Sequence, residues 1–272
     1  MGPDPLGGEM GELLGGPIGR SESSVLVVNP SEMWISTAIT TLSGESEPPA
    51  VWLLASEESL KWVMGDFIIG SRAADLIAAD TLSLRSMASP PRNSLVVGDS
   101  AVVSLVYSGG TVKGLSTDDD QFVERVRSHY EDVWDDAEPF SHRTPPLSRV
   151  YETLEDDIGA DVARDFETVL DALDVARGDG DGLDEVTISL LVAARNGVLL
   201  YDISRWGEDV GVASKATFSR TKTALEDSGL IATEKVPIDV GRPRLRLELG
   251  DERLQDATAA DLPSVAQSLL TD

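Results

Sequence analysis

The order of short elements between residues 183 and 250 constrains this 272-residue chain more than any other feature. Apolar residues recur there at helical spacing in three segments, separated by turn residues and followed by two β-type runs. The expected elements are helices over 184–195, 203–210 and 215–227, a short extended piece over 199–201, and strands beginning at 230 and covering 245–249. The last two helices are separated only by Gly211-Val212-Ala213, with Asp202 and Ser214 as expected N-caps. This order predicts a winged helix-turn-helix domain over 183–250.

The third helix has the composition of a recognition helix. Ala216, Phe218, Ala224 and Leu225 are expected to face the core, while the other side chains supply donors and small hydroxyl groups. Such groups suit base edges and phosphates in the major groove of double-stranded DNA, and basic side chains of a wing suit the DNA backbone. The predicted DNA-binding residues are Ser214, Lys215, Thr217, Ser219, Arg220, Lys222 and Thr223 on the helix and Arg242, Arg244 and Arg246 on the hairpin.

The charge distribution supports a polyanionic partner for this segment. The chain has a net charge of −26, yet residues 214–246 contain seven basic and four acidic residues and therefore sum to +3. Three of the five lysines of the chain lie in this stretch, at positions 215, 222 and 235. Local charge reversal of this kind is typical of nucleic-acid contact. A solvated hairpin around Arg242 to Arg244, without DNA contact, is the alternative for the wing.

The rest of the composition indicates a halophilic archaeal cytosol. Forty-eight acidic residues against 22 basic ones, in a chain that is 41% hydrophobic, exclude an acidic disordered protein, because disorder also requires low hydrophobicity. In molar salt, where the Debye length is about 3 Å, the carboxylates barely repel one another. The chain has no cysteine, no apolar run of membrane-spanning length and no secretory signal pattern. We therefore expect a cytoplasmic protein.

The N-terminal half predicts an α/β domain with a mixed sheet over 23–140, after a flexible tail over 1–22. Strand and helix patterns alternate first, and a β-meander then follows, with turns at Gly98-Asp99 and Gly109-Gly110. The expected strands are 24–28, 51–55, 82–87 and three runs within 94–115, and the expected helices are 33–42, 57–77 with breaks near Gly65 and Gly70, and 118–137.

A helical connector is predicted over 141–182, and residues 251–272 are expected to form a C-terminal tail with helical potential. The connector has an apolar stripe formed by Val162, Phe166, Val169, Leu170 and Leu173. This stripe, together with the paired half-sites that winged helices commonly bind, predicts a homodimer. Packing of the stripe on the chain's own first domain is the alternative.

The first domain has a weaker candidate site for a small-molecule effector. Asn29 and Ser31 lie where a strand leads into a helix, a position at which ligands often bind, and Gly98 and Asp99 are candidates beside them. Helix capping and a simple hairpin turn are the alternatives. Neither His129 nor His142 has an arguable catalytic partner, and the acidic run at 179–184 departs from a calcium loop. We expect no enzymatic activity, no metal site and no cofactor.

Three motifs resemble a known family. They are LVVNPS at 26–31, SLVVGDSAVVSLV at 94–106 and GVASKATFSRTKTALEDSGLI at 211–231. The chain resembles the TbsP family of haloarchaeal transcription regulators, which is similar in general organisation to TrmB-like sugar-responsive regulators. The resemblance implies control of central carbon metabolism. The DNA-binding part comes first in TrmB proteins and last here, so no sugar site is carried over.

The combined expectation is a sequence-specific, DNA-binding transcription regulator. Its partners would be double-stranded DNA, a second copy of the chain, and a small-molecule effector or a second regulator, with no role for a membrane. The alternative function is a protein-interaction module of the transcription apparatus that does not itself read DNA.

Overall fold

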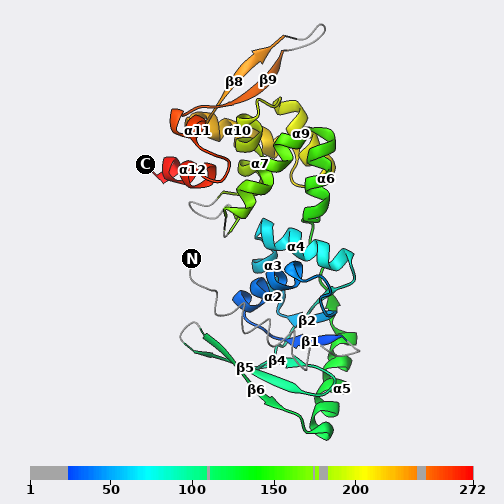
Figure 1. Ribbon diagram of the computed structural model, residues 1–272. Coiled ribbons are helices and arrows are strands. Elements are labelled where there is room, and N and C mark those ends of the chain that lie inside the picture. The colour runs from blue at the N-terminus through cyan, green and yellow to red at the C-terminus, as the bar shows by residue number, and fades with distance from the viewer. Residues whose placement is uncertain (1–23, 109–110, 174, 178–182, 238–242, 272) are drawn as a thin grey trace. The chain divides into compact units, whose positions relative to one another are not determined.

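The computed structural model describes residues 24–108, 111–173, 175–177, 183–237 and 243–271 (Figure 1). The chain folds into two compact units. Unit 1 contains the described residues up to 142 except 66–68, and unit 2 contains those three residues and everything from 143 onward. No helix in these ranges is both long and apolar enough to cross a membrane.

Unit 1 is built on a seven-stranded mixed sheet with the order β6-β5-β4-β1-β2-β3-β7. The strands are β1 (Val25–Val28), β2 (Val51–Ala55), β3 (Leu82–Ser86), β4 (Ser94–Val97), β5 (Val102–Ser108), β6 (Thr111–Thr117) and β7 (Glu138–Pro139). β1, β2 and β3 are parallel neighbours, and every other pairing is antiparallel. The apolar runs from which these parallel strands were predicted therefore form the centre of the sheet, where both faces are covered.

Helices cover both faces of this sheet (Figure 1). α2 (Glu32–Gly44), α3 (Glu57–Met64) and α4 (Phe67–Ala78) pack on one face, in a core that includes Val25, Val27 and Leu53. α5 (Asp120–Asp136) packs on the other face, where Trp134 stacks on Trp52 at 4.9 Å between ring centroids. Alternation of side chains along each strand separates these two cores.

The predicted mixed sheet is confirmed, and two details differ. The long helix expected over 57–77 breaks only between Met64 and Phe67, at Gly65 and Asp66, whereas Gly70 lies inside α4. β7 was not predicted, since two residues give no periodic signal. The expected Gly109-Gly110 turn and the tail over 1–22 lie outside the described residues.

Unit 2 contains the expected helix-turn-helix elements with additional helices on either side. The helices are α6 (Leu147–Asp157), α7 (Ala160–Asp171), α8 (Glu185–Arg195), α9 (Leu200–Val210), α10 (Lys215–Asp227), α11 (Glu252–Asp256) and α12 (Leu262–Thr271). β8 (Ile231–Val236) and β9 (Arg244–Leu249) form an antiparallel wing. The connector is thus two helices, separated at Gly159, whose φ of 143° suits glycine.

The apolar stripe of α7 does not form a dimer surface. Val162, Phe166, Val169 and Leu170 are each at most 5% exposed and belong to the same core as α8 and α9. The Phe166 ring contacts that of Trp206 edge-on at 6.4 Å. A three-helix domain leaves one side of its core open, and α7 closes it. Phe67, from the stretch expected to belong to the first domain, also contacts the Phe166 ring edge-on at 6.5 Å and belongs to this core of unit 2. The stripe is therefore buried without a second copy of the chain.

Candidate nucleic-acid interface

The turn between α9 and α10 is fixed by one carbonyl group. The Gly207 oxygen accepts hydrogen bonds from the backbone N–H groups of Gly211, Val212 and Ala213, at 3.2, 2.8 and 3.2 Å. Gly211 ends α9 in the left-handed conformation, with φ 96°. These bonds give a carbonyl group at the C-terminus of α9 its hydrogen-bond partners, and they fix the turn through which the chain enters α10.

Gly207 also sets the distance between the two helices. A β-carbon at this position would overlap the ring of Phe218, which is fully buried in the first turn of α10. α9 itself begins at Leu200, so Asp202 lies in its first turn and not at its N-cap as predicted. Only Leu199 of the expected extended piece over 199–201 is in a β-bridge, to Arg246.

Ser214 begins α10 as predicted from its capping preference. Its hydroxyl oxygen accepts a bond from the Thr217 N–H at 3.2 Å and lies 3.0 Å from the Thr217 hydroxyl. Both hydroxyl groups therefore bond within the first turn of the helix. They hold its exposed N-terminus in place for any ligand that approaches it.

The outward face of α10 consists of exposed residues at helical spacing, namely Lys215, Ala216, Ser219, Arg220, Thr223, Ala224 and Asp227. Phe218 and Leu225 face the core as expected. The predicted inward positions of Ala216 and Ala224 are wrong, because the core contact of the helix is narrower than its apolar content suggests. The Thr223 hydroxyl donates to the Ser219 carbonyl at 3.1 Å.

Lys222 does not lie on this outward face. Its ammonium group is 2.6 Å from the Glu226 carboxylate, and its side chain is only 12% exposed. Glu226 also accepts a bond from the Thr233 hydroxyl on β8, at 2.7 Å. Burial raises the pKa of Glu226, but the bonds from Lys222 and Thr233 outweigh it and hold the pKa below its usual value. Glu226 therefore links α10 to the wing, and Lys222 neutralises its charge.

The wing positions its arginines against neighbouring acids. Arg244 lies over the Tyr201 ring, 4.3 Å from the centroid, and its guanidinium is 3.4 Å from Asp202. Arg246 is 3.2 Å from Glu234 across the hairpin. Arg242 lies outside the described residues.

Lys215 has a carboxylate partner as well. Its ammonium is 2.5 Å from Glu208 on α9, and their side chains are 45% and 44% exposed. The hydrogen bond between them lowers the pKa of Glu208 and raises that of Lys215. Within the described α10, Arg220 is the one basic residue for which the structure gives no ionic partner. Sequence reasoning missed these pairs because their acids lie on other elements or one turn away.

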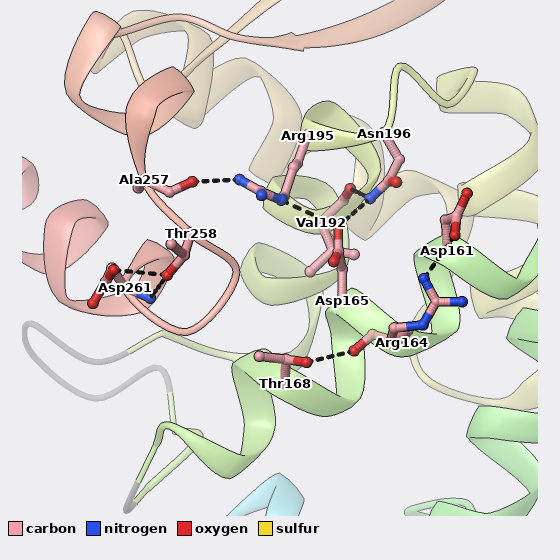
Figure 2. Close-up of polar contacts among 10 residues, drawn as sticks. All are labelled: Asp161, Arg164, Asp165, Thr168, Val192, Arg195, Asn196, Ala257, Thr258 and Asp261. Atoms are coloured by element: carbon pink, nitrogen blue, oxygen red, sulfur yellow. Dashed lines mark hydrogen bonds and ion pairs between the residues drawn. The ribbon is translucent and has the colours of Figure 1, made fainter.

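A cluster of polar contacts connects α7, the end of α8 and the chain between α11 and α12 (Figure 2). Arg195, at the end of α8, bonds to Asp165 of α7 at 3.1 Å and to the Ala257 carbonyl at 2.6 Å. Asn196 donates to the same Asp165 carboxylate at 2.9 Å. Beside them lies an open polar cleft of about 690 Å³, which the sequence did not reveal. Its lining includes Arg164, which pairs with Asp161 at 2.8 Å.

The candidate effector residues of unit 1 have internal bonding partners. Asn29, at φ 48°, donates to the Pro91 carbonyl at 2.6 Å, and Ser31 caps α2 by accepting from Trp34 N–H. The Gly98 N–H donates to the Ala101 carbonyl, and Asp99 is 3.0 Å from Arg127. In the described ranges, no group of three or more acidic or imidazole side chains is arranged to hold a metal ion.

Comparisons with known proteins identify the family. A search of curated proteins found no match. A solved structure of TrmBL2, described as an archaeal chromatin protein with a novel mode of DNA binding, is 14% identical with a TM-score of 0.34; the match covers 50% of this chain and 51% of that one. Two family models match nearly the whole chain: the N-terminal domain of TbsP-like transcriptional regulators over 3–145, and their C-terminal helix-turn-helix domain over 146–267. The chain therefore belongs to the TbsP-like transcriptional regulators.

Proposed function

We propose that this regulator binds double-stranded DNA sequence-specifically, with α10 in the major groove. The observation that carries the proposal is the exposed face of α10, where Arg220 has no ionic partner within the described helix and is surrounded by small side chains. Small neighbours allow close approach to base edges, and an arginine can donate two bonds to guanine. A helix that faces only solvent would need neither an arginine without an ionic partner nor small side chains around it.

The residues of this face divide by the contacts that they suit. Arg220 suits a guanine edge, the Ser219 and Thr223 hydroxyls suit phosphates or bases, and the Ala216 methyl suits the methyl group of thymine. Lys215 and Arg244 suit the DNA backbone, where a phosphate would replace Glu208 or Asp202 as partner. Ser214 and Thr217 hold the helix N-terminus, whose dipole favours a phosphate.

The cellular setting extends this proposal. The net charge of −26 supports a halophilic archaeal cytoplasm, and the family resemblance supports control of central carbon metabolism. A homodimer agrees with the paired half-sites that winged helices commonly bind. An effector at Asn29, Ser31, Gly98 and Asp99 stays a prediction, although their internal bonds give each residue another role. Mass spectrometry of metabolites that copurify with the protein tests it.

Competition binding in molar KCl tests the DNA-binding proposal. The preferred site is first selected from genomic fragments, and variants are then compared on that duplex and on a scrambled one. Arg220→Ala should weaken the preferred site about ten- to a hundredfold and the scrambled duplex much less, since a bidentate pair is worth about 1–3 kcal/mol of discrimination. Arg244→Ala should weaken both equally. Arg164→Ala, an exposed arginine of α7, is the control and should change neither.

Two outcomes contradict the proposal. Equal losses on both duplexes for Arg220→Ala would make Arg220 a phosphate contact. No selected fragment, with no effect of either variant, would favour a protein-interaction module. The ion pairs of Lys215, Arg244 and Arg246 give that alternative a specific basis, because they already neutralise much of the basic surface.

A further inference from the structure

The sheet of unit 1 ends in a long strand whose outer edge is paired with none of the described residues. β6 (Thr111–Thr117) is the last strand in the sheet order, and among the described residues only β5 pairs with it. Its residues 113–116 are exposed. The outer edge of such a strand presents a row of backbone donors and acceptors to any further strand, and proteins usually protect such edges.

This edge lacks the carboxylates that cover the rest of the protein. Residues 81–117 contain one acidic residue, Asp99, whereas the other 235 residues contain 47. Asp99 is turned to Arg127, and residues 100–117 contain no carboxylate at all. Where two copies of a chain with a net charge of −26 touch, carboxylates come within about one Debye length of each other and repel even in molar salt. The acid-poor edge is therefore the surface at which self-association meets the least repulsion.

Apolar side chains flank the edge on both faces of the sheet. Leu115 is 68% exposed and pairs with Ser104, so it lies on the same face as Val106, which is 44% exposed. On the opposite face Tyr107 is 41% exposed, and its hydroxyl accepts the N–H of Ser31 at the start of α2. Met33, two residues further, is 61% exposed. A strand added to β6 would cover apolar surface on both sides.

We infer that β6 is a self-association edge, at which β6 of a second copy pairs antiparallel to extend the sheet through a two-fold axis. An antiparallel pair of identical strands is self-complementary, as a two-fold dimer requires. With the axis near Leu115, the two Lys113 side chains lie on opposite sides of it and do not face each other. The inference concerns unit 1 alone and is independent of the proposed DNA contact.

Sedimentation velocity of the full chain, without DNA, in molar KCl at micromolar concentration tests the inference. The wild type should be a dimer. Leu115→Asp should raise the dimer dissociation constant at least tenfold, because it places one carboxylate per copy beside the axis. Leu270→Asp, at an exposed leucine of α12 in unit 2, is the matched control and should leave the dimer unchanged. Unchanged circular dichroism of Leu115→Asp separates lost association from unfolding.

Cysteine cross-linking gives a second readout, since the chain has no cysteine of its own. Single cysteines placed in turn at positions 113–116 should yield a disulfide-linked dimer at one or two of them, whereas Leu270→Cys should not. A monomeric wild type, a dimer that tolerates Leu115→Asp, or cross-linking at 270 alone would each overturn the inference. DNA binding by a monomeric variant to a single half-site would leave the proposed function standing.

Discussion

Replacement of Gly207 by alanine tests how the helix-turn-helix is held together. Gly207 lies on α9 where that helix crosses α10, and an added methyl group would overlap the Phe218 ring. Phe218 is fully buried, so the ring can move toward solvent only by giving up contacts with the core. The change therefore separates the two helices or displaces the ring.

Both responses destabilise the domain by a similar amount. Overpacking of a filled core costs about 1–3 kcal/mol. Moving a phenylalanine ring into water forfeits about 1.5–3 kcal/mol of burial. We expect Gly207→Ala to lower the free energy of unfolding of unit 2 by about 2–3 kcal/mol, even though alanine is the better helix former by about 1 kcal/mol.

Hydrogen exchange measured by mass spectrometry resolves the two units and is the appropriate assay. Amides of α9 and α10 should lose protection in Gly207→Ala while those of the unit 1 sheet keep it. Gly44→Ala is the control, because nothing lies within 4 Å of a β-carbon there and the change should be neutral or stabilising.

A double-mutant cycle identifies the cause. Phe218→Leu removes the atoms that the new methyl group meets, so Gly207→Ala should cost clearly less in that background than alone. Additive effects would refute steric contact as the origin of the loss. A stable Gly207→Ala protein would refute the close approach itself.

Three further predictions follow from charge. At about 0.05 M salt, where the Debye length exceeds 10 Å, circular dichroism should show unfolding, and an intact fold would count against a halophilic origin. Burial raises the pKa of Glu185 above its usual 4.5, so its ionised form destabilises the fold. Glu185→Gln should therefore raise the unfolding midpoint at pH 7, and this gain should disappear below pH 4.5, where the carboxyl group is protonated. Glu167→Gln, at an exposed position, is the control and should have no effect. Glu208→Gln releases Lys215 and should strengthen binding to specific and scrambled DNA alike, by about two- to fivefold; a gain on one duplex only would contradict that role.

Local signals predicted most of the fold. The short turn at 211–213 and the Ser214 cap are encoded within a few residues, and the structure has both where the sequence places them. Alternating strand and helix patterns also gave the mixed sheet of unit 1, because buried strands and amphipathic helices have different periods. Positions decided by local chemistry are therefore readable from one sequence.

Positions decided by tertiary contact were not readable. The α7 stripe predicted a dimer, yet α8 and α9 bury it, because periodicity shows that a face is apolar and not what covers it. Lys222 is a predicted DNA contact, but its ammonium group pairs with Glu226, which in turn accepts a bond from Thr233 of the wing. Long-range partners such as Asp202 for Arg244 are separated by 42 residues and leave no local pattern.

Salt should act on this protein's DNA binding in the opposite direction to the usual one. Neutralised phosphates normally release counterions, and affinity falls steeply with salt. Here Lys215, Arg244 and Arg246 already have carboxylate partners, so few free cations remain to release counterions. Residues outside 214–246 sum to −29 and repel DNA until salt screens them.

Affinity for the preferred duplex should therefore rise between about 0.5 and 2 M KCl, as screening removes repulsion faster than it weakens short-range contacts. Fluorescence anisotropy across this range measures it, with circular dichroism at each concentration to confirm that the protein stays folded. The Glu208→Gln variant, with one more unpaired cation, should show a smaller rise. A decline of several powers of the salt concentration would mean that counterion release from phosphate contacts outweighs the relief of repulsion by screening.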